Sequence, residues 1–104
     1  MSVSPAFALF GEAAPGFQQT WMAMVRQLAA NSALDTKTEE LAYLAVLAAT
    51  GLESGLPFHV SAAVRAGATR DEVVSALLVG LPAAGQRVVS ALPIAVATLD
   101  ELGA

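Results

Sequence analysis

The 104-residue chain contains no cysteine. Disulfide bonds, thiolate metal ligands, iron–sulfur clusters and thiol catalysis are therefore excluded. Basic residues are also scarce, because lysine and arginine together number 5 and lie scattered along the chain. This spacing provides no phosphate-binding patch, so we do not expect nucleic acid as a partner.

Long apolar segments are absent as well. The longest uninterrupted apolar run is Leu41–Ala49, whereas a helix needs about 20 residues to cross a bilayer. The first basic residue is Arg26, so the amino terminus lacks the positive start of a signal peptide. We therefore expect a cytoplasmic protein that does not associate with membranes.

Apolar surface, by contrast, is abundant. Hydrophobic residues make up 56% of the chain and charged residues only 13%. A domain of this length buries only about two-thirds of its extended surface, so a monomer would leave much apolar surface in water. We therefore expect a homo-oligomer.

The apolar residues recur with helical spacing, which predicts a single all-α domain of five or six helices over residues 1–104. Residues 1–14 have little pattern beyond Phe7 and Phe10, three residues apart. Residues 15–30 predict an amphipathic helix. We interpret its apolar stripe as core packing; the stripe comprises Phe17, Trp21, Met24, Val25 and Leu28.

The next helix has an unusual composition. Thr36 and Glu39 have the spacing of a capping box that opens a helix, and Gly51 is a typical helix stop. Between them, Leu41–Ala49 is apolar on every side. We expect this central helix to pack on its own chain on one side and on another subunit on the other.

Three further features predict the remaining helices. Pro57 is typical of the first turn of a helix, and Thr69 with Glu72 predicts a second capping box. From Leu81 to Leu102 the apolar residues alternate spacings of four and three, which is typical of a coiled-coil-like seam. Pro93 predicts a kink or a break in that seam.

Two polar residues lie on faces that the pattern would bury. Glu40 shares its face with Leu44 and Leu47, so it is either a partnered carboxylate or an exposed first-turn acid stabilised by the helix dipole. His59 is the only histidine and shares its face with Ala62. It is either a group that transfers protons near neutral pH or a core histidine bonded to a carbonyl. One histidine and scattered acids predict no metal site and no cofactor.

One stretch of the sequence resembles a known family. It begins with Glu40 and continues through the turn Gly51–His59, the small residues that end at Gly67 and the acidic helix start at Thr69–Glu72. It is similar to the carboxymuconolactone decarboxylase family, which includes the alkylhydroperoxidase D-like proteins. The resemblance covers about residues 36–82. It implies an all-α fold whose central helices pair between subunits, commonly in trimers or hexamers, with Glu40 and His59 facing one another.

The family that the chain resembles has two branches with different functions. The peroxidase branch carries a C-x-x-C-x-x-x-H motif, but Leu52 and Gly55 stand where its cysteines would be. The decarboxylase branch keeps the histidine, uses no cofactor and acts on a lactone bearing carboxylates. One hypothesis is a cofactor-independent lyase or isomerase for a small organic acid or lactone, with Glu40 and His59 as the catalytic proton relay. The other is a non-catalytic oligomer of the same fold that binds a small apolar or acidic ligand or serves assembly.

Contact between Glu40 and His59 depends on the path of the turn between them. In a simple helical hairpin Glu40 lies roughly 16 Å from the turn, because a helix rises about 1.5 Å per residue. Contact requires residues 52–56 to run back along the helix, or a partner subunit to supply one of the two side chains. We expect the first arrangement.

The absence of cysteine gives a direct prediction. The protein should show no thiol-dependent peroxidase activity, because no dithiol can form. A dithiol-coupled peroxide assay should give the same rate as a heat-inactivated control. A rate above that control would contradict the prediction.

Overall fold

The computed structural model describes residues 3–104, and within them it contains helices and no strand, which confirms the all-α class. Six helices have nine residues or more, and the two shortest, α6 and α7, have four each. None of the helices in residues 3–104 is long and apolar enough to cross a membrane. In chain order the elements are α1 (Pro5–Ala13), α2 (Pro15–Asn31), α3 (Thr36–Thr50), the 3-10 helix η1 (Glu53–Gly55), α4 (Leu56–Arg65), α5 (Arg70–Leu78), α6 (Leu81–Ala84), α7 (Gln86–Val89) and α8 (Leu92–Leu102).

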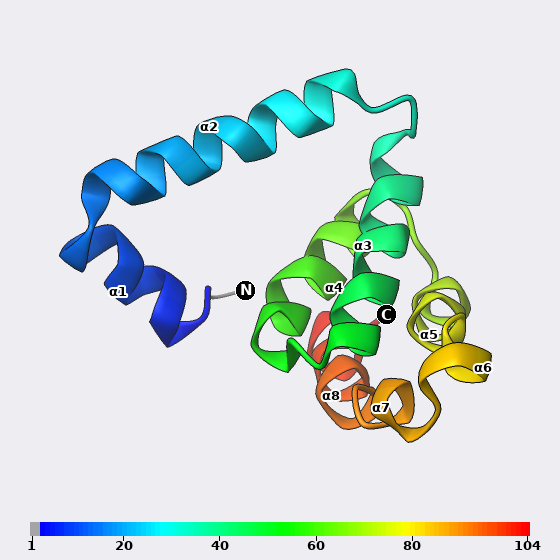
Figure 1. Cartoon of the computed structure of the whole chain (residues 1–104). Helices are drawn as coiled ribbons and strands as arrows, with labels where there is room; N and C mark the ends of the chain where they lie inside the picture. Colours follow the sequence, from blue (N-terminus) through cyan, green and yellow to red (C-terminus); the bar gives the residue numbers. More distant parts are fainter. Residues whose placement is uncertain (1–2) are drawn as a thin grey trace.

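Helix α3 is the centre of the body formed by α3 to α8. It packs against α4, α5 and α7, and α8 packs against α4 (Figure 1). The central position confirms that this apolar helix packs on its own chain, while its packing on another subunit stays a prediction. Its outer face carries Val46, which is 53% exposed, and Tyr43 on its flank is 45% exposed. The side chains that are fully buried in this core include Leu44, Leu56, Val60, Val73, Leu77, Val88 and Leu99.

The start of α3 differs from the sequence prediction. Asp35 caps the helix, because its Oδ1 accepts a hydrogen bond of 2.8 Å from the Thr38 N–H. A capping box between Thr36 and Glu39 was the wrong prediction, since Asp35 occupies the cap and Thr36 is already in the first turn. The Thr38 N–H lowers the pKa of the Asp35 carboxyl. At the other end, Gly51 is the left-handed C-cap, with φ +73°, as predicted.

The capping box at the start of α5 is confirmed. The Thr69 hydroxyl accepts from the Glu72 N–H, and Glu72 Oε1 accepts from the Thr69 N–H at 2.9 Å. Lys37 Nζ, on the first turn of α3, lies 2.9 Å from Glu72 Oε2 and so links the two helix starts. The hydrogen bond from Thr69 is the main cause of the lowered pKa of Glu72, and Lys37 adds to it.

The carboxyl-terminal seam is broken twice. The expected break near Pro93 is confirmed, because Pro93 lies in the first turn of a new helix, α8. A second break, which the seam pattern did not predict, occurs at Gly85 with φ +60°. The predicted seam positions are buried only in part: Val88 and Leu99 are fully buried, whereas Leu81 is 44% exposed.

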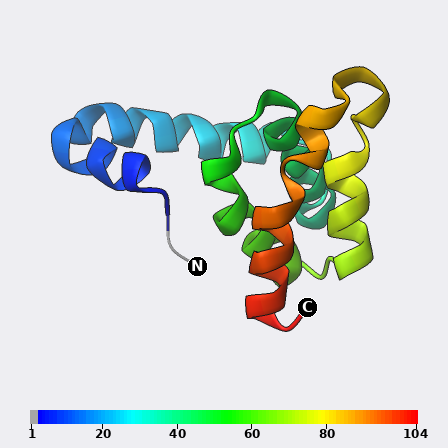
Figure 2. The same ribbon diagram turned by 90° about the horizontal axis from the view of Figure 1, so that it is seen from below.

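Helices α1 and α2 form an arm that stands away from this body, as both views show (Figures 1 and 2). Within the arm, Phe10 packs edge-on against Trp21 with ring centroids 6.4 Å apart. Neither helix has a buried residue. The interpretation of the α2 stripe as core was therefore wrong for a single chain: Phe17 is 76% exposed and Trp21 51% exposed.

The two lowered pKa values predict how stability depends on acidity. A carboxyl whose pKa is lower in the folded state stabilises the fold above its unfolded pKa, about 4, and this contribution is lost as the pH falls through the folded pKa. The Asp35→Asn, Glu72→Gln double variant keeps acceptor oxygens but has no titrating group at these positions. Between about pH 6 and pH 3 its free energy of unfolding, measured in urea, should fall less than that of the wild type. Equal losses in the two proteins would contradict this account.

Candidate active site

Glu40 on α3 and His59 on α4 contact each other within one chain. The imidazole Nδ1 lies 3.1 Å from Glu40 Oε2. Their side chains are 24% and 27% exposed, so the pair lies at the surface of the core with one side open. The expected contact between these two residues is therefore present, and no second subunit is needed to form it.

The turn between α3 and α4 explains how residues nineteen positions apart meet. Gly51 adopts a left-handed conformation, and the Leu52 N–H donates to the Leu47 carbonyl at 3.0 Å. The 3-10 turn then runs back along α3, because a Cβ atom placed on Gly55 would lie 3.4 Å from the Leu47 side chain. Helix α4 thus begins beside the last turns of α3 rather than beyond its end, as expected, and His59 reaches Glu40.

Two aromatic side chains flank the imidazole. The Tyr43 ring centroid lies 4.5 Å from that of His59, and the Phe58 centroid lies 5.1 Å away in an edge-on arrangement. Sequence reasoning missed Tyr43 as a site residue. Its spacing from Glu40 was the available signal, because residues three apart share a helix face.

The contact with Glu40 gives the two imidazole nitrogens of His59 different hydrogen-bonding roles. A carboxylate only accepts hydrogen bonds, so Nδ1 must carry the proton that joins His59 to Glu40. In the neutral ring Nε2 is then an acceptor, and in the charged ring it is a second donor. Among residues 3–104 the structure shows no hydrogen bond at Nε2, which leaves this nitrogen available to a ligand.

Four basic side chains, Lys37, Arg65, Arg70 and Arg87, contact other groups, and within residues 3–104 no ion pair joins a lysine or arginine to Glu40. Arg87 donates to the Thr50 carbonyl, and Thr50 lies ten residues after Glu40, about 15 Å along the helix. In the described chain no cluster of three or more histidine or acidic residues could hold a metal ion. The other contacts of basic groups are Lys37 with Glu72, Arg65 with the Ser61 hydroxyl, and Arg70 with Asp100 and the Ala104 carbonyl.

The sequence matches the profile of the Carboxymuconolactone decarboxylase family over residues 15–97. The chain belongs to this family. The match extends beyond the residues that carried the resemblance and takes in α2 and most of α8. No curated protein and no solved structure gave a significant match.

The role of Glu40 can be tested on the imidazole itself. We expect neutral His59 to carry its proton on Nδ1 in the wild type, because Glu40 accepts it. In Glu40→Ala that preference should be lost. Long-range proton–nitrogen NMR reports the tautomer, and assignment is simple because the chain has one histidine.

Glu39→Ala is the matched control, since Glu39 neighbours Glu40 in the first turns of α3 but is not the residue hydrogen-bonded to His59. The control should keep the wild-type tautomer. A tautomer unaffected by Glu40→Ala would show that the carboxylate does not orient the ring.

Proposed function

We propose that this protein is a cofactor-independent lyase or isomerase of the carboxymuconolactone decarboxylase family that acts on a small organic acid or lactone. Glu40 and His59 form its proton relay. The observation that carries the proposal is the 3.1 Å contact between His59 Nδ1 and Glu40 Oε2, with Nε2 left unbonded by the described chain.

The chemistry needs one well-placed acid. When a γ-carboxylate leaves an unsaturated lactone as carbon dioxide, the electron pair of the broken carbon–carbon bond is delocalised through the ring double bond into the lactone carbonyl as a dienolate. Protonated His59 then donates the Nε2 proton to carbon and completes the product. Glu40 stabilises the charged ring and holds Nδ1, so that the neutral ring takes its next proton at Nε2.

The surroundings support a substrate with little charge. Tyr43 and Phe58 give the imidazole apolar neighbours. Lys37, one turn before Glu40 on α3, pairs with Glu72, and within residues 3–104 no ion pair joins a lysine or arginine to Glu40. A substrate with several carboxylates would lose hydration here without gaining a cationic partner. We therefore infer a ligand that is small and carries at most one carboxylate.

A second candidate is a non-catalytic protein of the same fold that binds an apolar ligand. The exposed apolar side chains beside the site favour it, because Leu52 is 58% exposed and Phe58 38% exposed. In this case the same surface would bind a small molecule without proton transfer.

The two candidates differ in turnover. An unsaturated five-membered lactone with a single carboxylate on its γ-carbon is the probe, and the assay follows carbon dioxide release and deuterium incorporation into product carbon in heavy water. The wild type should catalyse both. Glu40→Gln should slow the reaction and His59→Gln should slow it by about 10²–10⁴-fold, the usual contribution of a positioned acid or base.

Glu39→Gln is the control and should keep the wild-type rate, since it loses the same charge one residue from the site. Turnover that persists unchanged in His59→Gln would contradict the relay. Binding of the probe without turnover in any variant would favour the non-catalytic candidate.

A further inference from the structure

The arm formed by α1 and α2 exposes an apolar stripe that its own chain does not cover. Phe17, Trp21, Met24 and Leu28 recur at helical spacing along one face of α2 and are 76%, 51%, 45% and 61% exposed. The described part of α1 and α2 has no buried residue. A contiguous apolar face of this kind usually marks an interface.

The exposed area matches one protein–protein interface. The accessible surface of the chain is 6344 Å², roughly 900 Å² more than a compact monomer of its mass exposes. A stable interface buries about 800 Å² on each partner. The radius of gyration, 14.0 Å, likewise exceeds the value of about 13 Å for a compact chain of this length.

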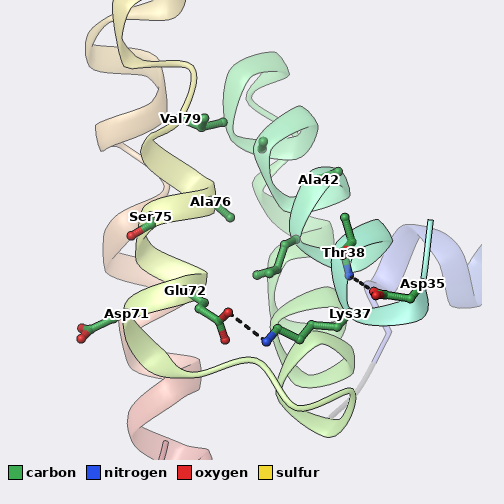
Figure 3. Close-up of a pocket in the computed structure, with 11 residues that line it drawn as sticks. Asp35, Lys37, Thr38, Ala42, Asp71, Glu72, Ser75, Ala76 and Val79 are labelled. Atoms are coloured by element: carbon green, nitrogen blue, oxygen red, sulfur yellow. Dashed lines mark hydrogen bonds and ion pairs between the residues drawn. The ribbon is translucent and has the colours of Figure 1, made fainter.

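A groove lies on the body between α3 and α5, with apolar residues such as Leu41 and Val79 and with charged residues, Asp35, Lys37, Asp71 and Glu72, in its lining. Its volume is about 890 Å³. Figure 3 shows Ala76 and Val79 pointing from α5 towards α3, and the Lys37–Glu72 ion pair bridging the two helices at one end. Three of the lining residues are alanines, Ala42, Ala45 and Ala76, and such short side chains allow another helix to approach closely.

The stripe is long enough to fill the groove. Phe17 to Leu28 spans about 16 Å of α2, and the groove-lining residues of α3 run about 12 Å from Lys37 to Ala45. The large side chains of the stripe thus complement the short alanines of the groove, the kind of surface on which an amphipathic helix binds.

The arm does not reach the groove of its own chain. Within the link between α2 and α3, the Ser32 hydroxyl accepts from the Leu34 N–H and Asp35 accepts from the Thr38 N–H. In both views the arm extends on the α4 side of α3, whereas α5 lies on the other side (Figures 1 and 2).

We propose that α2 of one copy docks in the α3–α5 groove of a second copy, with Phe17, Trp21 and Met24 as its anchors. The contact joins two different surfaces, so it is heterologous and can close a ring of copies. It covers the outer side of Ala42 and Ala45 on α3, and it gives the arm the apolar partner that its own chain lacks.

The first test measures mass in solution. Light scattering at micromolar concentration should give at least twice the chain mass of 10.6 kDa for the wild type. Trp21→Glu on the arm and Ala42→Glu in the groove should each reduce the mass to that of a monomer. The matched controls are Gln19→Glu, on the opposite face of α2, and Ala97→Glu, on an exposed position of α8, and both should keep the wild-type mass.

The second test identifies which surfaces meet. An equimolar mixture of Trp21→Glu and Ala42→Glu contains one intact arm and one intact groove, so it should recover a species of two chains. The only tryptophan provides a second signal: Trp21 emission should shift to longer wavelength in Ala42→Glu, although that substitution lies on the body. Circular dichroism confirms that the single variants remain folded.

Three outcomes would overturn the proposal. They are a monomeric wild type, an oligomer that survives Trp21→Glu or Ala42→Glu, and a mixture of the two variants that stays monomeric. If the arms packed on each other instead of in the groove, Ala42→Glu would keep the wild-type mass, because its arm is intact.

Discussion

The position of His59 depends on the way the chain reverses at the end of α3. Gly51 takes a left-handed conformation, and the 3-10 turn that follows lies against Leu47 rather than continuing away from the helix. Without this reversal, α4 would start beyond the end of α3 and its imidazole would lie a helix length from Glu40. Gly51 serves the reversal by supplying the positive φ, which glycine adopts without steric cost.

Helix α3 has two tasks, and its composition reflects both. Its inner face builds the core through Leu44, Leu47 and Ala48, which are at most 4% exposed. Glu40 and Tyr43 lie on the flank that faces α4, where the carboxylate meets His59. Because α3 is held rigidly by packing on three helices, the carboxylate is held at a defined position instead of moving with a loop.

Features that depend on neighbours in the chain could be predicted from the sequence. The Thr69–Glu72 capping box, the Gly51 stop and the break near Pro93 each follow from local backbone geometry. The Glu40–His59 contact could also be predicted, since the resemblance to a family supplied the pairing and the turn length limited how it forms. The start of α3 was placed at the wrong capping residue because Asp35 and Thr36 are both good caps, and only the geometry of the turn decides between them.

Features set by tertiary packing could not be predicted in this way. The periodicity of Phe17 to Leu28 identifies an apolar face but not the surface that covers it, so its interpretation as core failed. The second break at Gly85 similarly requires knowledge of where α7 packs. Tyr43 was missed because an apolar run conceals an aromatic residue that serves both packing and the site.

The interaction free energy between the Glu40 and His59 side chains tests the proposed site most directly. A double-mutant cycle compares the free energies of unfolding of the wild type, Glu40→Ala, His59→Ala and the double variant in urea near neutral pH. Residues in contact usually show an interaction energy of about 0.5–3 kcal/mol, and we expect a value in this range that stabilises the fold. An interaction energy indistinguishable from zero would contradict the claim that the reversed turn brings the two side chains together.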